Sequence, residues 1–286
     1  MNVMHVYLDG EILPLAQARI SPEDRAFLFA DGVYEALVAR RGRLLFWEEH
    51  ERRMRGGLAA LRIGNADVAA LRSVAEELLR RNELLAGDAL VYLQVSRGAA
   101  PRLHAFPDPP VPATVYATVK ALPGHPPSLI AAGAAAATVA DTRWARCDIK
   151  STALLANVLA QQQAKDAGAQ EALFVRDGVA LEGGHSNLFA VRGGELWTYP
   201  ACNYILDGVT RGHVLALAAD LGIPVRLAAL PLGDLYGADE VFLSGTTTEV
   251  MPVVMVDGRR IGAGAPGPIT RRLRDAYLQL VDERAR

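Results

Sequence analysis

Cysteine is almost absent from the sequence, which contains only Cys147 and Cys202 among its 286 residues. Two cysteines are too few for a disulfide framework, and their spacing matches no metal-binding motif. A disulfide-stapled secreted domain and a zinc module are therefore excluded, and a reducing compartment is favoured.

The sequence also lacks an excess of one charge and a long hydrophobic run. Its formal net charge of -2 gives no sign of a nucleic-acid partner. The longest apolar stretch, LIAAGAAAATVA, is too short and too rich in alanine and glycine to span a bilayer. The first residues, MNVMHVYLDG, show no basic start followed by an apolar run, as a secretory signal would. We therefore expect a cytoplasmic protein with neither a nucleic-acid nor a membrane partner.

What is present is typical of a globular protein large enough for two domains, with 51% hydrophobic and 22% charged residues. The first half combines Val- and Tyr-rich strands with helices that carry leucine and alanine at helical spacing, which predicts an α+β domain over residues 1–120. ALPGHPPS, residues 121–128, concentrates proline and glycine and is the predicted linker. A second domain is expected over residues 129–286. Hairpin turns are predicted at Asp9-Gly10, Gly42, Asp177-Gly178 and Gly193-Gly194.

Two segments of the second half bear on the site. AAAATVADTRWARCDI could be helical by its alanines, but Thr138, Val139 and the alternation toward Trp144 favour a strand. TALLANVLAQQQAKDAG, from Thr152, carries apolar residues on one stripe and ends at Gly168, which predicts a helix.

Lysine is the scarce cation, since only Lys120, Lys150 and Lys165 occur among 30 basic residues. Lys165 falls on the polar side of the predicted helix, and Lys120 ends a strand, so both favour a surface role. Lys150, in WARCDIKST, lies at a strand-to-helix junction among small and apolar residues. A buried amine there would have a lowered pKa and be nucleophilic toward aldehydes. The alternative is a structural ion pair with Asp148.

Two glycine- and threonine-rich segments could bind an anion. LSGTTTE places Gly245 and three threonines after a strand, and DGVTRGHV places Gly208 and Thr210 at a helix start. Backbone N-H groups and hydroxyls in such places suit a phosphate monoester, although each segment taken alone is more often a plain turn or cap. Arg53 could add a phosphate contact, unless it is solvated like most helix arginines.

A carboxylate and a group of cations complete the candidates. Glu182, in LEGGHSN, could be exposed or could face a protonated ring nitrogen. SRGAAPRLHAFP carries Arg97, Arg102 and His104 in a proline-flanked loop, where they could form a carboxylate clamp or remain solvated.

Six ordered motifs together resemble the class IV pyridoxal-phosphate aminotransferases, a family that includes D-amino acid aminotransferases, branched-chain L-aminotransferases and aminodeoxychorismate lyase. They are DGVYE, EEHERRM, RWARCDIKS, LEGGHSN, ILDGVTR and SGTTTE. The resemblance covers almost the whole chain. It implies an α+β, two-domain enzyme of fold type IV, with pyridoxal 5'-phosphate in the interdomain cleft.

The resemblance also implies roles for particular residues. Lys150 would form the Schiff base with the cofactor and carry a proton between the substrate Cα and the cofactor. Glu182 would pair with the pyridinium nitrogen, and Leu206 would pack on the ring. The phosphate would be held by Arg53, Val209, Thr210, Gly245 and Thr246.

Within the family, the PRxH pattern of SRGAAPRLHAFP resembles the D-amino acid aminotransferases. There the loop reaches into the neighbouring subunit's site, which implies a homodimer. Tyr34, Arg102 and His104 would clamp the substrate α-carboxylate, and Thr247 would contact the substrate. The substrates implied are D-alanine or a similar D-amino acid and a 2-oxo acid, 2-oxoglutarate.

This chain departs from the D-specific pattern at Gly184, His185 and Gly245, where serines are usual, so the side-chain preference stays open. Three alternatives also remain: a branched-chain or (R)-amine transaminase, lyase chemistry on aminodeoxychorismate, and a binding protein without catalysis.

Overall fold

The computed structural model describes residues 3–286, which divide into two compact units. Unit 1 contains the described residues up to Gly124 together with Ile149–Ala153 and Arg284–Arg286. Unit 2 contains His125–Asp148 and Leu154–Glu283. The segment Ile149–Ala153, which contains Lys150, belongs to unit 1 although it follows the predicted linker in the sequence. Within the described part of the chain, no helix is both long and apolar enough to cross a bilayer.

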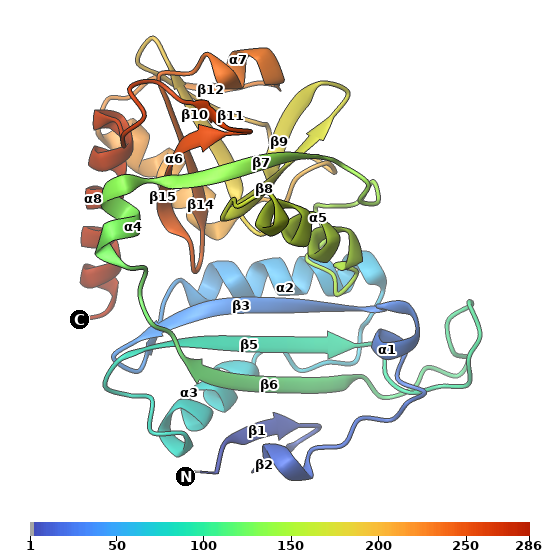
Figure 1. Cartoon of the computed structure of the whole chain (residues 1–286). Coiled ribbons are helices and arrows are strands. Elements are labelled where there is room, and N and C mark those ends of the chain that lie inside the picture. Colours follow the sequence, from blue (N-terminus) through green and yellow to red (C-terminus); the bar gives the residue numbers. More distant parts are fainter. Residues whose placement is uncertain (1–2) are drawn as a thin grey trace. The chain divides into compact units, whose positions relative to one another are not determined.

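Unit 1 is built on a six-stranded antiparallel sheet with the order β2-β1-β6-β5-β3-β4 (Figure 1). Its strands are β1 His5–Leu8, β2 Glu11–Pro14, β3 Gly32–Arg40, β4 Arg43–Leu44, β5 Asp88–Ser96 and β6 Thr114–Ala121. Its helices are α1 Arg25–Phe29, α2 Trp47–Leu61 and α3 Leu71–Arg81, with a 3-10 turn at Leu15–Gln17.

The helices α2 and α3 cover one face of this sheet. Side chains that alternate along β3, β5 and β6 pack with those of α2 and α3 into one apolar core, as Val33, Leu93 and Met54 do. The register pairs Tyr34 with Gln94 and Gln94 with Tyr116, so these three side chains lie in one row on the opposite face. All three are half-buried, so this face of the sheet is amphipathic.

Unit 2 is built on a larger sheet, and some of its strands close into a ring. Its strands follow the path β12-β11-β10-β14-β15-β7-β8-β9-β13, with β16 beside β15. Because β9 also pairs with β10, the strands β10, β14, β15, β7, β8 and β9 form a closed ring. The pair that closes it is Glu182 and Asn187. The candidate residue Glu182 therefore lies at the seam of the ring.

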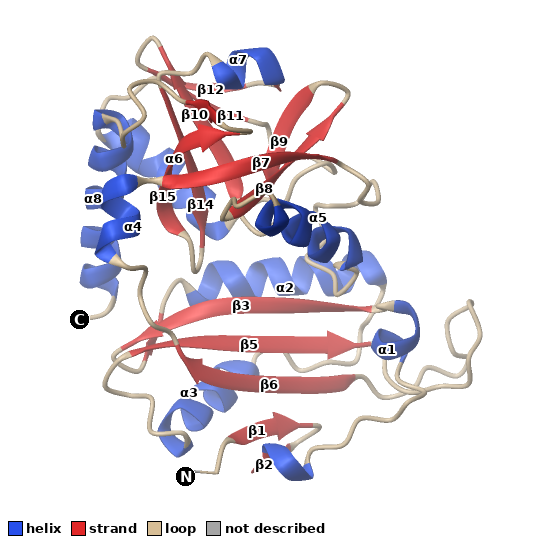
Figure 2. Ribbon diagram, in the orientation of Figure 1, coloured by secondary structure: helices blue, strands red, loops and turns tan. Residues whose placement is uncertain are grey.

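Figure 2 shows the helices and strands of unit 2 and the loops that join them. Its strands are β7 Ala134–Ala140, β8 Glu171–Arg176, β9 Val179–Gly183, β10 Asn187–Arg192, β11 Glu195–Thr198, β12 Val225–Leu227, β13 Leu230–Pro231, β14 Glu240–Gly245, β15 Glu249–Val256 and β16 Arg259–Arg260. Its helices are α4 Pro127–Ala132, α5 Leu155–Asp166, α6 Val209–Asp220, α7 Leu232–Tyr236 and α8 Pro268–Arg284.

The turn predictions are confirmed, and the strand prediction for the alanine-rich stretch is confirmed in part. All four predicted hairpins form, and at the third of them Asp177 and Gly178 have φ angles of 51° and 74°. Such a two-residue turn with positive φ matches the twist of the strands that it joins, which is why Asp-Gly signals a hairpin. The alanines form the strand β7 rather than a helix, but the strand ends at Ala140. The expected continuation toward Trp144 is wrong, because residues 141–149 lie in turns and loops, and Lys150 therefore follows a loop rather than a strand.

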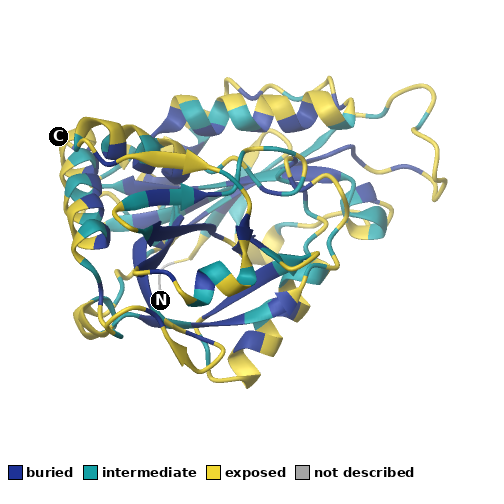
Figure 3. Cartoon of the chain, turned by 90° about the horizontal axis from the view of Figure 1, so that it is seen from above, coloured by how far each residue is buried: buried dark blue, intermediate teal, exposed yellow. Residues whose placement is uncertain are grey.

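The prediction for the helix after Lys150 needs a correction. α5 begins at Leu155 rather than Thr152, and part of its apolar stripe faces away from the core. Leu155, Val158 and Leu159 are 73%, 61% and 62% exposed, whereas the residues that it buries are alanines. Figure 3 shows the general pattern, with buried residues along the strands and exposed ones on the outer sides of helices and in loops.

Candidate active site

Lys150 is fixed by its backbone to the start of β3. Tyr34 N donates to Lys150 O at 3.0 Å, and Ser151 forms an isolated bridge with Val33. The Thr152 hydroxyl donates to Ala30 O at 2.9 Å. Lys150 is half-buried, and its Nζ lies 4.3 Å from the centroid of the Tyr34 ring. The lysine therefore has a fixed origin and a flexible amine beside an aromatic face.

The alternative role for Lys150, an ion pair with Asp148, does not form. Asp148 is bound instead by Arg146, whose Nη2 lies 2.9 Å from Asp148 Oδ2. Both side chains of this pair are exposed. The amine of Lys150 is thus not tied to the neighbouring carboxylate.

Arg53, a predicted phosphate ligand on α2, is oriented by a buried carboxylate. Its Nε and Nη2 donate to Oε1 and Oε2 of Glu35 at 2.7 and 2.8 Å. His50 Nδ1 lies 2.7 Å from Glu35 Oε2. Burial would raise the pKa of Glu35, but the charge and hydrogen bonds of Arg53 lower it to about 2. Burial also lowers the pKa of His50. Glu35 is a residue that sequence reasoning missed, although the E of DGVYE was its signal.

The loop with the predicted clamp is exposed in the single chain. Arg102 and His104 pack on Phe29, with 5.2 Å from Arg102 Cζ and 5.5 Å from the His104 ring to its centroid. Within the described chain, neither forms a hydrogen bond, an ion pair or a ring contact with Tyr34, which stacks on Tyr92 at 5.5 Å. One chain alone therefore does not assemble the three residues.

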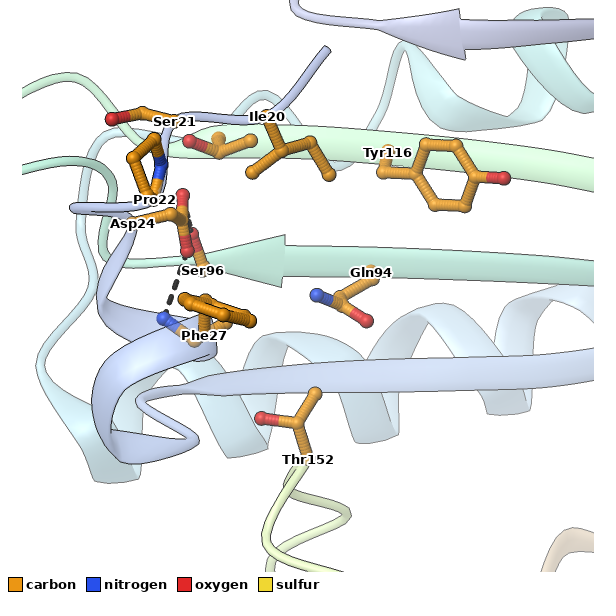
Figure 4. Close-up of a pocket in the computed structure, with 11 residues that line it drawn as sticks. Ile20, Ser21, Pro22, Asp24, Phe27, Gln94, Ser96, Tyr116 and Thr152 are labelled. Atoms are coloured by element: carbon orange, nitrogen blue, oxygen red, sulfur yellow. Dashed lines mark hydrogen bonds between the residues drawn. The ribbon is translucent and has the colours of Figure 1, made fainter. Parts of the chain in front are cut away.

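A cavity of about 430 Å³ opens on the face of the unit 1 sheet opposite α2 and α3 (Figure 4). Gln94, Tyr116 and Thr152 line it, and Figure 4 shows Phe27 and Asp24 on its other side. The Ser96 hydroxyl donates to Asp24 at 2.9 Å, and Asp24 caps α1 by accepting from Ala26 N at 2.8 Å. The cavity thus borders the row that contains Tyr34. The residues that line it are Ile20, Ser21, Pro22, Asp24, Ala26, Phe27, Gln94, Ser96, Thr114, Tyr116 and Thr152.

In unit 2, Glu182 is a buried carboxylate that accepts several hydrogen bonds. Arg143 Nη1 donates to its Oε1, while Asn187 Nδ2 and Leu206 N each donate to its Oε2 at 3.1 Å. Burial raises the pKa of Glu182 to about 7 despite these donors. The group can therefore hold either a proton or a negative charge near neutral pH.

Arg143 links Glu182 to a wider charge network. Its Nε lies 2.9 Å from Oδ1 of the buried Asp141, which also pairs with Arg176 at 3.0 Å. Burial would lower the pKa of Arg143, but the hydrogen bond with Asp141 and the charge of Glu182 raise it above its usual range. Its guanidinium also stacks on Phe174 at 4.0 Å. Sequence reasoning missed Arg143, although it opens the motif RWARCDIKS.

We expect the contribution of Glu182 to the stability of the cofactor-free protein to decrease as the pH rises from 4.5, the ordinary pKa of a glutamate, to about 7. The folded state binds the proton of Glu182 more tightly than the unfolded chain and so carries more protons in this window. At about 1.4 kcal/mol per pKa unit, the loss is about 3 kcal/mol. Urea unfolding of the wild type and of Glu182→Gln, at pH 4.5 and at about pH 7, measures this loss of stability. An equal pH dependence in the two proteins would contradict the assignment.

The two predicted anion-binding segments both lie in unit 2. α6 starts at Val209 with Gly208 as its N-cap and no side-chain cap, and Thr210 is buried in its first turn. The first N-H groups of such a helix are available to an anion. A Cβ on Gly208 would lie 2.1 Å from Asn187 Oδ1, so a side chain at this position would displace the Asn187 amide. Asn187 also donates to Leu206 O at 2.8 Å.

The second segment is the turn between β14 and β15. Gly245, Thr246 and Thr247 are half-buried and Thr248 is buried. Thr247 O lies 2.8 Å from His125 Nε2. A Cβ on Gly245 would lie 3.2 Å from Thr248 Oγ1, so a serine would be crowded.

Gly184 and His185, two of the departures from the D-specific pattern, both lie next to Glu171. His185 Nδ1 lies 3.2 Å from Oε1 of the buried Glu171. A Cβ on Gly184 would lie 2.9 Å from the same Glu171 oxygen. Glycine at 184 therefore leaves room for the carboxylate that pairs with His185.

Comparison with known proteins identifies the chain. Residues 32–256 match the family model described as amino-transferase class IV. A D-alanine aminotransferase of Staphylococcus haemolyticus is 38% identical over 98% of this chain and 99% of its own length. One of Bacillus licheniformis is 38% identical over 96% and 95%. Among solved structures, the pyridoxal-phosphate form of a branched-chain amino acid aminotransferase from Thermobaculum terrenum superposes with a TM-score of 0.86 at 26% identity, covering 99% of this chain and 95% of that one.

The mixed α/β fold is therefore that of the fold type IV enzymes, as the sequence motifs predicted. The chain belongs to the class IV aminotransferase family, and it is an aminotransferase.

Proposed function

We propose that this enzyme is a pyridoxal-phosphate-dependent D-amino acid transaminase, which moves the amino group of D-alanine or a similar D-amino acid to 2-oxoglutarate. The observation that carries the proposal is the 38% identity, over 98% of the chain, to a relative named D-alanine aminotransferase. The PRLH segment at residues 101–104 supports the same substrate class.

The chemistry of the candidate residues fits pyridoxal phosphate. An aldehyde requires an amine, a ring nitrogen that carries positive charge requires a carboxylate, and a phosphate requires N-H donors. Lys150 offers the amine, and the buried Glu182 offers the carboxylate. The donors would come from Arg53, Val209, Thr210, Gly245 and Thr246, and Leu206 would pack on the ring.

Bound pyridoxal phosphate supplies an electron sink for the substrate Cα. Lys150 Nζ would take the proton from Cα and deliver it on the cofactor side. Water would then supply the carbonyl oxygen of the 2-oxo acid that leaves, and the amino group would stay on the cofactor, which completes one half-reaction. Glu182 stays ionised when it faces the ring nitrogen and so holds the positive charge there. Glu35 fixes the orientation of the Arg53 guanidinium.

The carboxylate clamp would set the stereochemical preference. Tyr34, Arg102 and His104 would bind the substrate α-carboxylate, with Thr247 as a further contact. Placing the carboxylate on one side turns the Cα-H of a D-substrate toward Lys150.

A homodimer is part of this proposal, because one chain leaves Arg102 and His104 away from Tyr34. Large apolar side chains on the same unit are exposed, with Phe27 at 76% and Leu103 at 64%, which is typical of a surface that another chain covers. The molar mass in solution tests this. The two free cysteines favour a cytoplasmic enzyme.

The second candidate is a branched-chain L-aminotransferase, which the likeness to the Thermobaculum terrenum enzyme favours. We expect D-alanine alone to remove the visible absorption band of the enzyme with bound cofactor, and 2-oxoglutarate to restore it. L-Leucine and L-alanine are added separately for comparison. Removal of the band by L-leucine instead would reject the D-specific proposal.

Arg102→Ala is expected to lower kcat/KM for D-alanine by roughly 10- to 100-fold, the usual effect of losing a hydrogen bond to a charged group. O-Methylhydroxylamine, which reacts with the cofactor aldehyde but has no carboxylate, should react with the variant as with the wild type. An unchanged kcat/KM would exclude Arg102 from the clamp.

A further inference from the structure

Arg25 is a buried cation whose hydrogen bonds go to the loop with the predicted clamp. It is only 3% exposed, on the first turn of α1. Its Nη1 donates to Leu103 O at 2.6 Å and to Ala105 O at 3.4 Å, and its Nη2 donates to His104 O at 3.4 Å. One guanidinium thus binds three successive carbonyls, which lie directly after Arg102.

The charge of Arg25 is compensated within the same unit. Its Nε donates to Asp31 Oδ2 at 2.8 Å, and Arg97 donates to both oxygens of Asp31 at 2.7 and 2.9 Å. Burial would raise the pKa of Asp31, but the hydrogen bonds from Arg97 and Arg25 lower it below its ordinary value. Asp31 therefore stays ionised and holds both guanidinium groups.

Arg97 has a structural role and is not available as a clamp residue. It is 8% exposed, donates to Leu61 O at 2.7 Å and to Arg62 O at 3.2 Å, and lies 3.6 Å from the centroid of the Phe106 ring. Its contacts fix the start of the loop and Phe106 beyond it. Of the three cations in SRGAAPRLHAFP, only Arg102 and His104 remain for the substrate.

Phe29 provides a second support for the same loop. Its ring lies 4.8 Å from Arg25 Cζ, 5.2 Å from Arg102 Cζ and 5.5 Å from the His104 ring. Both predicted clamp side chains therefore pack on one ring, next to the guanidinium that binds the three carbonyls after Arg102. Arg102, Leu103 and His104 are exposed, so the loop has little apolar burial of its own.

We propose that Arg25 is a positioning residue, which acts through the carbonyls of Leu103, His104 and Ala105 to hold Arg102 and His104 in the arrangement that recognises an α-carboxylate. This inference rests on the proposed function. The free energy for ordering the loop comes from the buried Arg25-Asp31-Arg97 group, so substrate binding need not supply it.

The first test uses aminooxyacetate and O-methylhydroxylamine, two nucleophiles that react with the cofactor aldehyde. Only the former has a carboxylate. Arg25→Met should slow the reaction with aminooxyacetate by about 10-fold or more and leave that with O-methylhydroxylamine unchanged. For D-alanine, KM should rise by a similar factor while kcat changes less than about threefold. Arg55→Met removes an exposed helix arginine that pairs with Glu51 and should behave as the wild type.

The second test needs no cofactor. Amide hydrogen exchange over residues 100–108 should be faster in Arg25→Met than in the wild type and in Arg55→Met. Arg25→Lys keeps a charge for Asp31, but one ammonium group cannot span Asp31 and three carbonyls, so it should shift both readouts in the same direction. If Arg25→Met does not fold, Arg25→Lys and Phe29→Leu carry the test.

The outcomes separate this inference from the proposed function. If Arg102→Ala abolishes the preference for aminooxyacetate and the Arg25 variants keep it, Arg25 has no positioning role and the clamp stands. If Arg102→Ala itself keeps the preference, the clamp is wrong and the inference fails with it. Slower reaction of the Arg25 variants with both nucleophiles would indicate general damage and overturn the proposal.

Discussion

Lys150→Ala is expected to abolish transamination, with kcat at least about 10⁴-fold below that of the wild type. A positioned proton-transfer group contributes about 10²- to 10⁴-fold, and this variant also loses the covalent attachment of the cofactor. No other described lysine can replace Lys150, because Lys120 and Lys165 are exposed and belong to β6 and α5. The backbone bond from Tyr34 N to Lys150 O does not involve the side chain, so the variant should fold.

Borohydride reduction gives a readout besides activity. In the wild type it should fix the cofactor to the peptide that contains Lys150, and in Lys150→Ala no peptide should carry it. Lys165→Ala, on the exposed side of α5, is the matched control and should keep both labelling and activity. A cofactor fixed to Lys120 or Lys165 in the wild type would overturn the assignment of Lys150.

Much of the fold follows from local signals. The predicted turns at Asp9-Gly10 and Asp177-Gly178 form because positive φ suits strand twist, and this preference is encoded in two adjacent residues. Local signals are weaker for the strand β7. Its alanines favour a helix, and pairing with β8 and β15 decides that it is a strand. Local propensity is sufficient for the first case and insufficient for the second.

Long-range placement could not be derived from periodicity. The segment Ile149–Ala153 pairs with β3, more than 100 residues earlier, and no local pattern indicates that partner. Similarly, the spacing of Leu155, Val158 and Leu159 predicts a helix but not which side of it faces solvent.

The motifs located most of the candidate site but not the residues that support it. Lys150, Arg53 and Glu182 stand out as residue types with recognisable chemistry. Glu35 and Arg143 act by hydrogen bonds to Arg53 and Glu182, and such pairs become visible only when the chain is folded. Arg97 shows the converse, because a cation that looks free in the sequence is bound to Asp31.

Glu182→Gln should lower kcat for D-alanine by about 10²- to 10³-fold, the usual loss on removing one preorganised group from a site of developing charge. An ionised Glu182 can hold a proton on the ring nitrogen of the cofactor, whereas a neutral amide cannot. The change preserves shape, and Asp141 still pairs with Arg143. We therefore expect a catalytic defect in a folded protein.

The ionisation of Glu182 should also be visible in the pH dependence of cofactor binding. In the cofactor-free protein its pKa is raised to about 7, so binding that requires the carboxylate should strengthen as the pH rises through this range. Glu182→Gln should remove that dependence.

Glu240→Gln is the matched control. Glu240 is also a buried acid of unit 2, but it accepts from Ile269 N and Thr270 N at the start of α8. Its replacement should cost stability, about 1 kcal/mol for a lost helix cap, and leave kcat unchanged. Equal loss of kcat in both variants would show that the effect of Glu182 is structural, because only Glu182 is assigned to the ring nitrogen.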